Sequence, residues 1–167
     1  MIDYRMKSEE ITIKEESVHS PEARMLLSEL SRALSQITGC SGERSFDPDQ
    51  MDDPRACFAI ARDDSGAAVG CGGFRPVENT TAEMKRVYSK VNGKGIGKRI
   101  LAFLEGRAAE FDFDRIIVET RVVNENAVHF YLQNGYQVIP NYGKYVGHEE
   151  AICFEKLLKP SSMKTES

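Results

Sequence analysis

The residues best suited to chemistry form a glycine-rich turn at the start of an apolar helical pattern. The turn comprises Asn92, Gly93, Lys94, Gly95, Ile96, Gly97 and Lys98. The first turn of a helix has backbone N–H groups without intrahelical partners, and the helix dipole adds partial positive charge there. Glycines lack the Cβ atoms that would hold an anion away, and the two lysines add charge. The turn therefore predicts a site at which backbone N–H groups bind phosphate.

Two common nucleotide-binding loops do not fit this spacing. A Walker A loop has the pattern GxxxxGK[ST], but only three residues separate Gly93 from Gly97, and Arg99 stands where the Mg²⁺-binding hydroxyl is needed. A dinucleotide fingerprint has the spacing GxGxxG early in a parallel βαβ unit, whereas this turn reads GxGxG and follows several expected strands. The phosphate is therefore expected to belong to another kind of ligand.

The turn needs elements on both sides to position its N–H groups. A strand is expected over residues 82–88, and another over residues 116–120. A short helix is expected from Asn124 or Glu125 through Gln133, with Gly135 just past its end. The helix that the turn opens has an apolar stripe formed by Ile96, Ile100, Leu101, Leu104 and Ala108. The strand at residues 82–88, the turn, the helix and the strand at residues 116–120 follow one another along the chain. This order predicts two parallel strands joined by a right-handed crossover.

The remaining patterns complete one α/β (α+β) domain. A short strand at residues 11–13 precedes a helix that begins at Ser20 and ends at Gly39. Residues 40–55 read as a loop or a short helical turn. The other strands are expected at residues 57–62, 67–74, 136–139 and 151–157. The result is a mixed, mostly antiparallel twisted sheet flanked by about four helices, a single domain over residues 10–158, with flexible ends at 1–9 and 159–167.

Two sequence blocks resemble the GNAT N-acetyltransferase superfamily. Residues 82–88 and the glycine turn resemble its acetyl-CoA-binding motif, Arg/Gln-x-x-Gly-x-Gly/Ala, with Gly95 and Gly97 matching and Asn92 replacing the first residue. Residues 124–136 look like the family's later segment, N-x-x-A-x-x-x-Y-x-x-x-G-F/Y, and residues 153–157 look like its last strand. The resemblance covers roughly residues 10–158 and implies a GNAT-like fold.

The resemblance also implies roles for individual residues. The side chains of Asn124 and Asn126 would contact acetyl-CoA, and the hydroxyl of Tyr131 would protonate the leaving CoA thiolate. Backbone N–H groups from Asn92 to Lys98 would hold the pyrophosphate. The pantetheine arm would pair like an added strand with the backbone of Val87, Tyr88 and Ser89.

The chemistry needs an acid and a base. A phenol with a pKa near 10 stays protonated at neutral pH and can donate to a thiolate, although a tyrosine at helical spacing such as Tyr131 also suits a core position. A lysine-like amine has a pKa near 10.4, so its neutral form costs about 4.6 kcal/mol at pH 7. Some members of the family that this chain resembles carry a carboxylate base on the strand before the glycine turn, so Glu83 is the proposed general base, and Glu119 on the next strand is the reserve. His129 is expected to be a surface histidine.

Composition limits the partners. The net charge of −4 argues against a nucleic-acid binder. No apolar stretch approaches the roughly 20 residues that span a bilayer, and the N-terminus lacks a signal-peptide core, so a cytoplasmic protein without a membrane partner is expected. The spacings of Cys40, Cys57, Cys71 and Cys153, and the scattered histidines, predict no metal site.

The predicted function is therefore transfer of an acetyl group from acetyl-CoA to a primary amine of a small molecule, peptide or protein, by direct attack and without a metal. The alternative is a non-catalytic regulatory module that binds acetyl-CoA or CoA. Residues 40–55 and 140–145 are expected to shape the acceptor pocket, and their acidic and aromatic side chains favour a cationic amine. A homodimer is the expected assembly if the chain has one.

Overall fold

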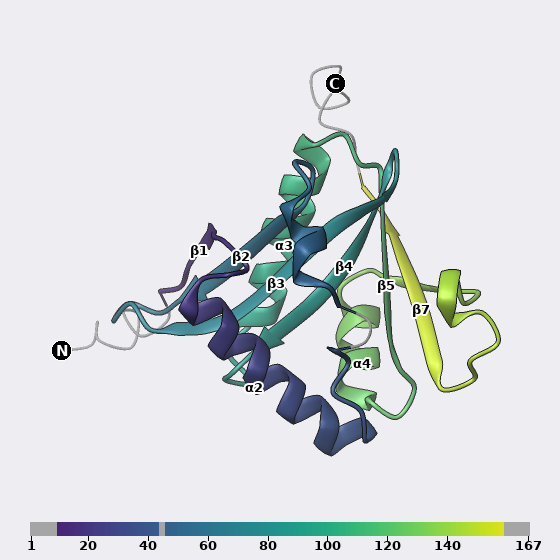
Figure 1. Ribbon diagram of the computed structural model, residues 1–167, viewed down its shortest axis with the longest axis horizontal. Coiled ribbons are helices and arrows are strands. Elements are labelled where there is room, and N and C mark those ends of the chain that lie inside the picture. Colours follow the sequence, from purple (N-terminus) through teal and green to yellow (C-terminus); the bar gives the residue numbers. More distant parts are fainter. Residues whose placement is uncertain (1–9, 44–45, 159–167) are drawn as a thin grey trace.

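The computed structural model describes residues 10–43 and 46–158, so the ends expected to be flexible, 1–9 and 159–167, lie outside the described residues. Seven strands of these described residues form one twisted sheet in the order β1-β2-β3-β4-β5-β7-β6 (Figure 1). Neighbouring strands are antiparallel except β4 and β5, which are parallel. The described residues thus form the mixed, mostly antiparallel sheet that the sequence predicts.

In the N-terminal half, the described residues supply one α-helix and four strands. Ser20 caps α2 because its hydroxyl accepts a hydrogen bond from the Ala23 N–H at 3.1 Å, and Gly39 ends the helix at φ 80°. The elements of this half are β1 (Thr12–Glu15), α2 (Pro21–Thr38), the 3-10 helix η2 (Pro48–Asp52), β2 (Cys57–Arg62), β3 (Ala68–Glu78) and β4 (Thr81–Ser89).

The C-terminal half continues the crossover. Asn124 caps α4 by accepting a hydrogen bond from the Ala127 N–H at 3.3 Å, and Gly135 follows that helix at φ 91°. The elements are α3 (Ile96–Glu110), β5 (Arg115–Arg121), α4 (Glu125–Gln133), β6 (Gln137–Ile139), the 3-10 helix η3 (Gly143–Tyr145) and β7 (Ala151–Leu157).

Two sequence predictions need correction. About four helices were expected, but residues 10–43 and 46–158 contain three α-helices. The segment between α2 and β2 forms only the five-residue η2, which begins at Pro48 and is followed by Pro54. Strand β3 continues to Glu78, beyond the expected end at Phe74. Pro76 is tolerated because the pairing of β2 with β3 ends at Phe74, so no neighbouring β2 carbonyl needs a donor there.

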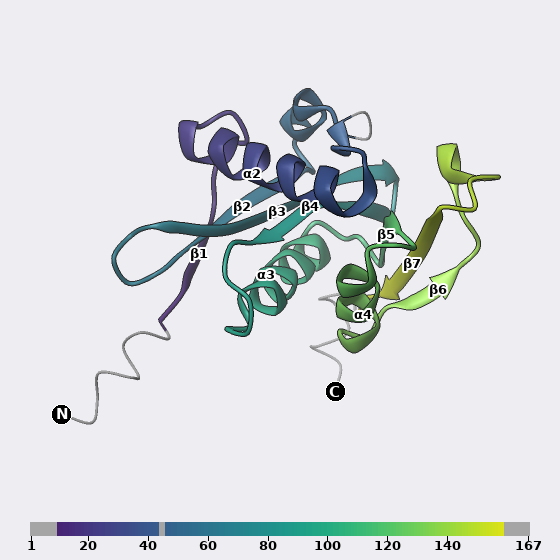
Figure 2. The ribbon, with the colours of Figure 1, turned by 90° about the horizontal axis from the view of Figure 1, so that it is seen from below.

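Helices cover both faces of the sheet (Figure 2). Helix α2 lies on one face against β3 and β4, whereas α3 packs on the other face against β2, β3 and β4, with α4 on the same side against β5. The larger core fills the α3 side and includes fully buried Phe74, Ile100, Leu104 and Phe154. Each such side chain contributes about 1.5–3 kcal/mol when buried. None of the helices in the described part of the chain is long and apolar enough to cross a membrane.

Candidate active site

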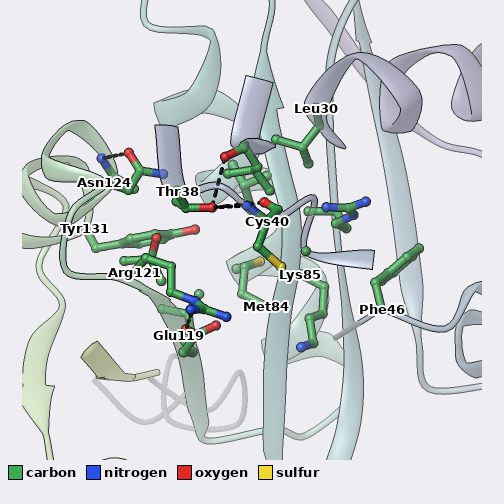
Figure 3. Close-up of a pocket in the computed structure, with 17 residues that line it drawn as sticks. Leu30, Thr38, Cys40, Phe46, Met84, Lys85, Glu119, Arg121, Asn124 and Tyr131 are labelled. Atoms are coloured by element: carbon green, nitrogen blue, oxygen red, sulfur yellow. Dashed lines mark hydrogen bonds and ion pairs between the residues drawn. The ribbon is translucent and has the colours of Figure 1, made fainter. Parts of the chain in front are cut away.

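The candidate site is the gap between the two parallel strands at the centre of the sheet. β4 and β5 pair only from Thr81–Arg115 to Glu83–Ile117, and beyond these residues they separate. A cavity of about 170 Å³ opens there, bounded by β4, β5, α4 and the end of α2 (Figure 3). Side chains that line it include Leu30, Leu34, Thr38, Cys40, Phe46, Met84, Lys85, Arg86, Val118, Glu119, Arg121, Asn124 and Tyr131.

A β-bulge shapes the β4 wall of this cavity. Lys85 pairs with Gly73 and Tyr88 with Cys71, so Arg86 and Val87 together stand opposite the single residue Gly72. Arg86 has φ 59°, a left-handed conformation that costs a non-glycine residue about 1–3 kcal/mol. After Glu83, the edge of β4 that faces β5 has no strand partner among the described residues. Its backbone groups are thus available to an extended ligand.

Tyr131 reaches the cavity from α4. Its ring packs against Tyr136 and Phe154, with centroid distances of 5.4 and 5.7 Å, while its hydroxyl points toward the centre of the cavity (Figure 3). Burial, and to a smaller extent the charge of Glu119, raise the pKa of the Tyr131 phenol. The group therefore keeps its proton at neutral pH, so a hydrogen-bond and proton donor faces the cavity.

Glu119 brings a carboxylate into the same cavity from β5. Burial raises its pKa, although Arg121, whose Nε lies 3.8 Å from Glu119 Oε2, and Lys85 both oppose this effect. Glu119 Oε2 is buried and accepts no hydrogen bond within the described protein. A carboxylate with a raised pKa is a stronger base, so Glu119 has the properties of a proton acceptor.

Glu83 lies outside this cavity, in a neighbouring pocket of about 480 Å³. Its side chain is 2 % exposed, and Oε1 lies 2.8 Å from an Arg75 nitrogen in an ion pair that lacks hydrogen-bond geometry. The Tyr142 hydroxyl donates to Oε2 at 2.7 Å, and the Lys85 ammonium lies 3.5 Å from Oε2. The structure therefore brings Glu119, rather than Glu83, to the cavity that Tyr131 lines.

The glycine turn lies at the start of α3. Gly93 and Gly95 have φ angles of 79° and 70°, and an added Cβ would meet nothing within 4 Å at either. Their requirement for glycine is therefore conformational. Gly95 is the N-cap of α3, and no side chain caps its first N–H groups, as the phosphate prediction requires. Gly97 has a different role, since its Cβ would lie 3.1 Å from the Phe130 ring of α4.

The other sequence candidates fall into two groups. Val87 and Asn124 line the cavity, whereas Asn126 and His129 are exposed. The side chains of Tyr88 and Ser89 bond elsewhere, to Glu29 at 3.3 Å and to the Val91 carbonyl at 2.7 Å. For both, the predicted contact with pantetheine concerns the backbone.

Several lining residues escaped the sequence analysis. Lys85, Arg86 and Arg121 carry no motif, and Cys40 reaches the cavity only because the chain after α2 folds back over β4. For the three charged residues, the sequence offers one indication of a place in the site: each is polar and stands on a strand before or after the glycine turn and its helix. Away from the cavity, ligand atoms of His19, Asp49 and Asp52 lie within 4.8 Å of one another, and all three residues are exposed.

Fold and site together define a class: a domain with a splayed pair of parallel strands beside a glycine-capped helix. The model of the GNAT acetyltransferase family matches residues 24–136, which is more than half of the chain. The protein belongs to this family.

Individual relatives agree with this assignment. An "IAA acetyltransferase" of Azospirillum brasilense is 27% identical over 151 residues, covering 89% of this chain and 98% of the relative. A Klebsiella pneumoniae protein assigned as an acyl-CoA N-acyltransferase has a TM-score of 0.76 and 27% identity, covering 90% of this chain and 99% of the other. The PaiA N-acetyltransferase of Thermoplasma acidophilum, solved with coenzyme A, shares the fold at a TM-score of 0.69 and 18% identity, over 89% of this chain and 99% of that one.

Proposed function

We propose that this protein transfers the acetyl group of acetyl-CoA to a primary amine by direct attack. The observation that carries the proposal is the shared cavity, in which a protonated phenol, Tyr131, and a carboxylate, Glu119, meet beside the unpaired edge of β4. Acetyl transfer from a thioester needs a proton donor for sulfur and an acceptor for the amine proton. This cavity offers both.

The residues present suit acetyl-CoA as the donor substrate. The uncapped N–H groups of α3 and the exposed Lys94 and Lys98 match a pyrophosphate. The free edge of β4 at Val87, Tyr88 and Ser89 matches the amide-bearing pantetheine arm. Asn124 at the N-terminus of α4 adds a polar group on the cavity wall, and Asn126 stands exposed near the same end.

Proton transfer follows from the positions of the two groups. Glu119 accepts a proton from the ammonium form and leaves a neutral amine. The amine nitrogen then forms a bond to the thioester carbonyl carbon, and the carbon–sulfur bond breaks. Tyr131 donates its phenolic proton to the departing sulfur and regains one from the nitrogen, which must lose a second proton on forming the amide. Glu83 is the alternative base, but it would have to act from the adjacent pocket through Lys85 or water.

The first test is binding followed by turnover. Acetyl-CoA is expected to raise the melting temperature of the protein, because a ligand that binds only the folded state stabilises it. Release of free CoA thiol is then measured against a panel of primary amines, and initial rates at varied concentrations of both substrates should give intersecting lines in a double-reciprocal plot. Parallel lines would instead indicate an acyl-enzyme, for which Cys40 on the cavity wall is the candidate.

The same test distinguishes the enzyme from a non-catalytic module that binds CoA. Asn92 stands where the family motif has Arg or Gln, and residues 91–95 are all exposed. Tight acetyl-CoA binding without turnover of any amine would therefore favour a non-catalytic module that senses CoA. The absence of a thermal shift with acetyl-CoA would contradict both functions.

A further inference from the structure

The charges around the cavity are unbalanced. Its lining includes three cationic side chains, Lys85, Arg86 and Arg121, but only one carboxylate, Glu119. The acidic residues of the η2 segment do not correct this. Asp47 accepts a hydrogen bond from the Asp49 N–H, Asp53 accepts one from the Arg55 N–H, and neither lines the cavity. The sequence-based preference for a cationic acceptor is therefore not reproduced at the cavity itself.

Arg86 is the least compensated of the three cations. Its guanidinium donates to the Ser31 hydroxyl at 2.6 Å and to the Ser41 carbonyl at 3.3 Å, and its Nε is buried without a hydrogen-bond partner. None of the ion pairs among the described residues includes Arg86, whereas Lys85 pairs with Glu83 and Arg121 with Glu119 and Glu150. Burial lowers the pKa of Arg86, and the charges of Cys71 and Glu43 oppose this effect without outweighing it.

Arg86 lies where it could contact an acceptor bound in the cavity. Its Nη1 is next to Gly42, since a Cβ on Gly42 would lie 3.2 Å from that atom, and Gly42 and Arg86 both line the cavity. Arg86 belongs to β4 and Glu119 to β5, the two strands on either side of the gap. A partly desolvated guanidinium that no described carboxylate contacts in an ion pair favours an anionic ligand, because an opposite charge offsets the cost of burying it.

Resting on the acetyltransferase function proposed above, we propose that the acceptor is an amine that also carries a carboxylate, which Arg86 binds while the amine faces Glu119. The other side chains that line the cavity indicate the polarity of the rest of the acceptor. Leu30, Leu34, Phe46, Met84 and Val118 present apolar surface, which suits an aliphatic or aromatic body. The substrate class is thus an apolar amino acid.

Matched acceptors test this proposal. L-Phenylalanine is compared with L-phenylalaninamide and phenethylamine, which keep the ring and amine but lack the carboxylate. 6-Aminohexanoate is compared with hexylamine, to distinguish an α-amino acid from one whose amine is distant from its carboxylate. The acceptors with a carboxylate are expected to have a kcat/KM at least roughly tenfold above their partners that lack it, the effect of one charge-assisted hydrogen-bonded pair.

Variants identify the residue that reads the carboxylate. Arg86→Gln retains a donor for Ser31 but removes the charge, and it should lower kcat/KM for the preferred carboxylate by roughly tenfold to a hundredfold while leaving its amide within about threefold. Arg86→Lys should restore part of the preference. Arg32→Gln, an equal loss of charge at an exposed position of α2, is the control and should leave kcat/KM unchanged for both acceptors.

The outcomes separate this proposal from the function on which it rests. Equal or better turnover of the amines that lack a carboxylate, or an equal loss for acid and amide in Arg86→Gln, would overturn the carboxylate proposal while leaving the acetyltransferase intact. If no amine is turned over, calorimetry of the CoA-saturated protein with N-acetyl-L-phenylalanine and its amide still decides. Tighter binding of the acid, lost in Arg86→Gln, supports the carboxylate site, and equal binding of the two contradicts it.

Discussion

Glu119 on β5 and Tyr131 on α4 line one cavity, and the charge of Glu119 contributes to the raised pKa of the Tyr131 phenol. The pair is electrostatically coupled although twelve positions separate the residues in the chain. Each ionised form disfavours the other, so at neutral pH the phenol stays protonated while the carboxylate can ionise. Acetyl transfer to an amine needs a protonated group that can donate to the sulfur and a group that can accept the amine proton.

Tyr131→Phe should lower kcat by about 10²–10⁴-fold, the usual contribution of a general acid. The KM for acetyl-CoA should change little, because the ring keeps its contacts with Tyr136 and Phe154. Steady-state release of CoA thiol measures both quantities. Tyr136→Phe is the matched control. It removes a 2.8 Å hydrogen bond to the Glu105 carboxylate outside the cavity, so it should cost about 1.5–3 kcal/mol of stability without lowering kcat. A Tyr131→Phe enzyme with full kcat would remove the phenol from the mechanism.

Glu119→Gln should abolish the acidic limb of the pH–rate profile. In the parent, turnover falls as pH decreases through the raised pKa of Glu119, because the protonated carboxyl accepts no proton. The variant should lose about 10²–10⁴-fold in kcat and show no such limb. Glu83→Gln is the comparison. If Glu83→Gln removes the limb and Glu119→Gln leaves it, the base is Glu83, as the sequence alone predicted.

Glu119 should also affect stability in a pH-dependent way. Its pKa is raised in the folded state, so the folded protein holds this proton more tightly than the unfolded chain does. The resulting stabilisation is present below the ordinary carboxyl pKa and is lost as pH rises through the raised value. Glu119→Gln should therefore be more stable than the parent toward urea at pH 7, with the difference vanishing near about pH 4. A difference that is constant with pH would contradict this assignment.

Most of the fold could be predicted because its signals are local. The cap at Ser20, the glycine at position 39 and the stripe of α3 each act within one helix, and the structure confirms them. Strand β3 was cut short at Phe74 because its last residues depend on pairing with β4, and no local pattern reports that register. The helix count was wrong for a similar reason, since a polar segment with prolines does not reveal whether it closes a helical turn.

The site was predictable only where a motif marks it. Tyr131 and Asn124 were found through their sequence block, and the structure places both on the cavity wall. The choice between Glu83 and Glu119 depends on which residues stand across from each strand. Arg75 and Tyr142, 8 and 59 positions from Glu83, surround its carboxylate, and their approach follows from the whole sheet. The spacing of residues along β4 does not indicate which side chains of other elements surround the Glu83 carboxylate.

Tyr142→Phe should destabilise the protein by about 1.5–3 kcal/mol, the range for a hydrogen bond to a charged group. The Tyr142 hydroxyl donates at 2.7 Å to Glu83, whose carboxylate is almost fully buried, so the variant leaves that charge with one donor fewer. Urea unfolding at pH 7 measures the loss. Tyr88→Phe removes a longer bond of 3.3 Å to Glu29 at a more exposed site, and should cost less than about 1 kcal/mol. Equal stability of the two variants would argue against a structural role for the Tyr142–Glu83 bond.

Gly95→Ala should weaken acetyl-CoA binding and lower stability together. The residue has φ 70°, where an alanine costs about 1–2 kcal/mol, and the strain acts on the turn whose N–H groups are assigned to the pyrophosphate. Gly66→Ala is the matched control, because Gly66 has φ 89° and equally open surroundings but lies in the β2–β3 hairpin. Both variants should lose similar stability in urea, and only Gly95→Ala should raise the Kd for acetyl-CoA measured by calorimetry. If the two variants bind acetyl-CoA equally well, the glycine turn holds its conformation for folding alone and the pyrophosphate binds elsewhere.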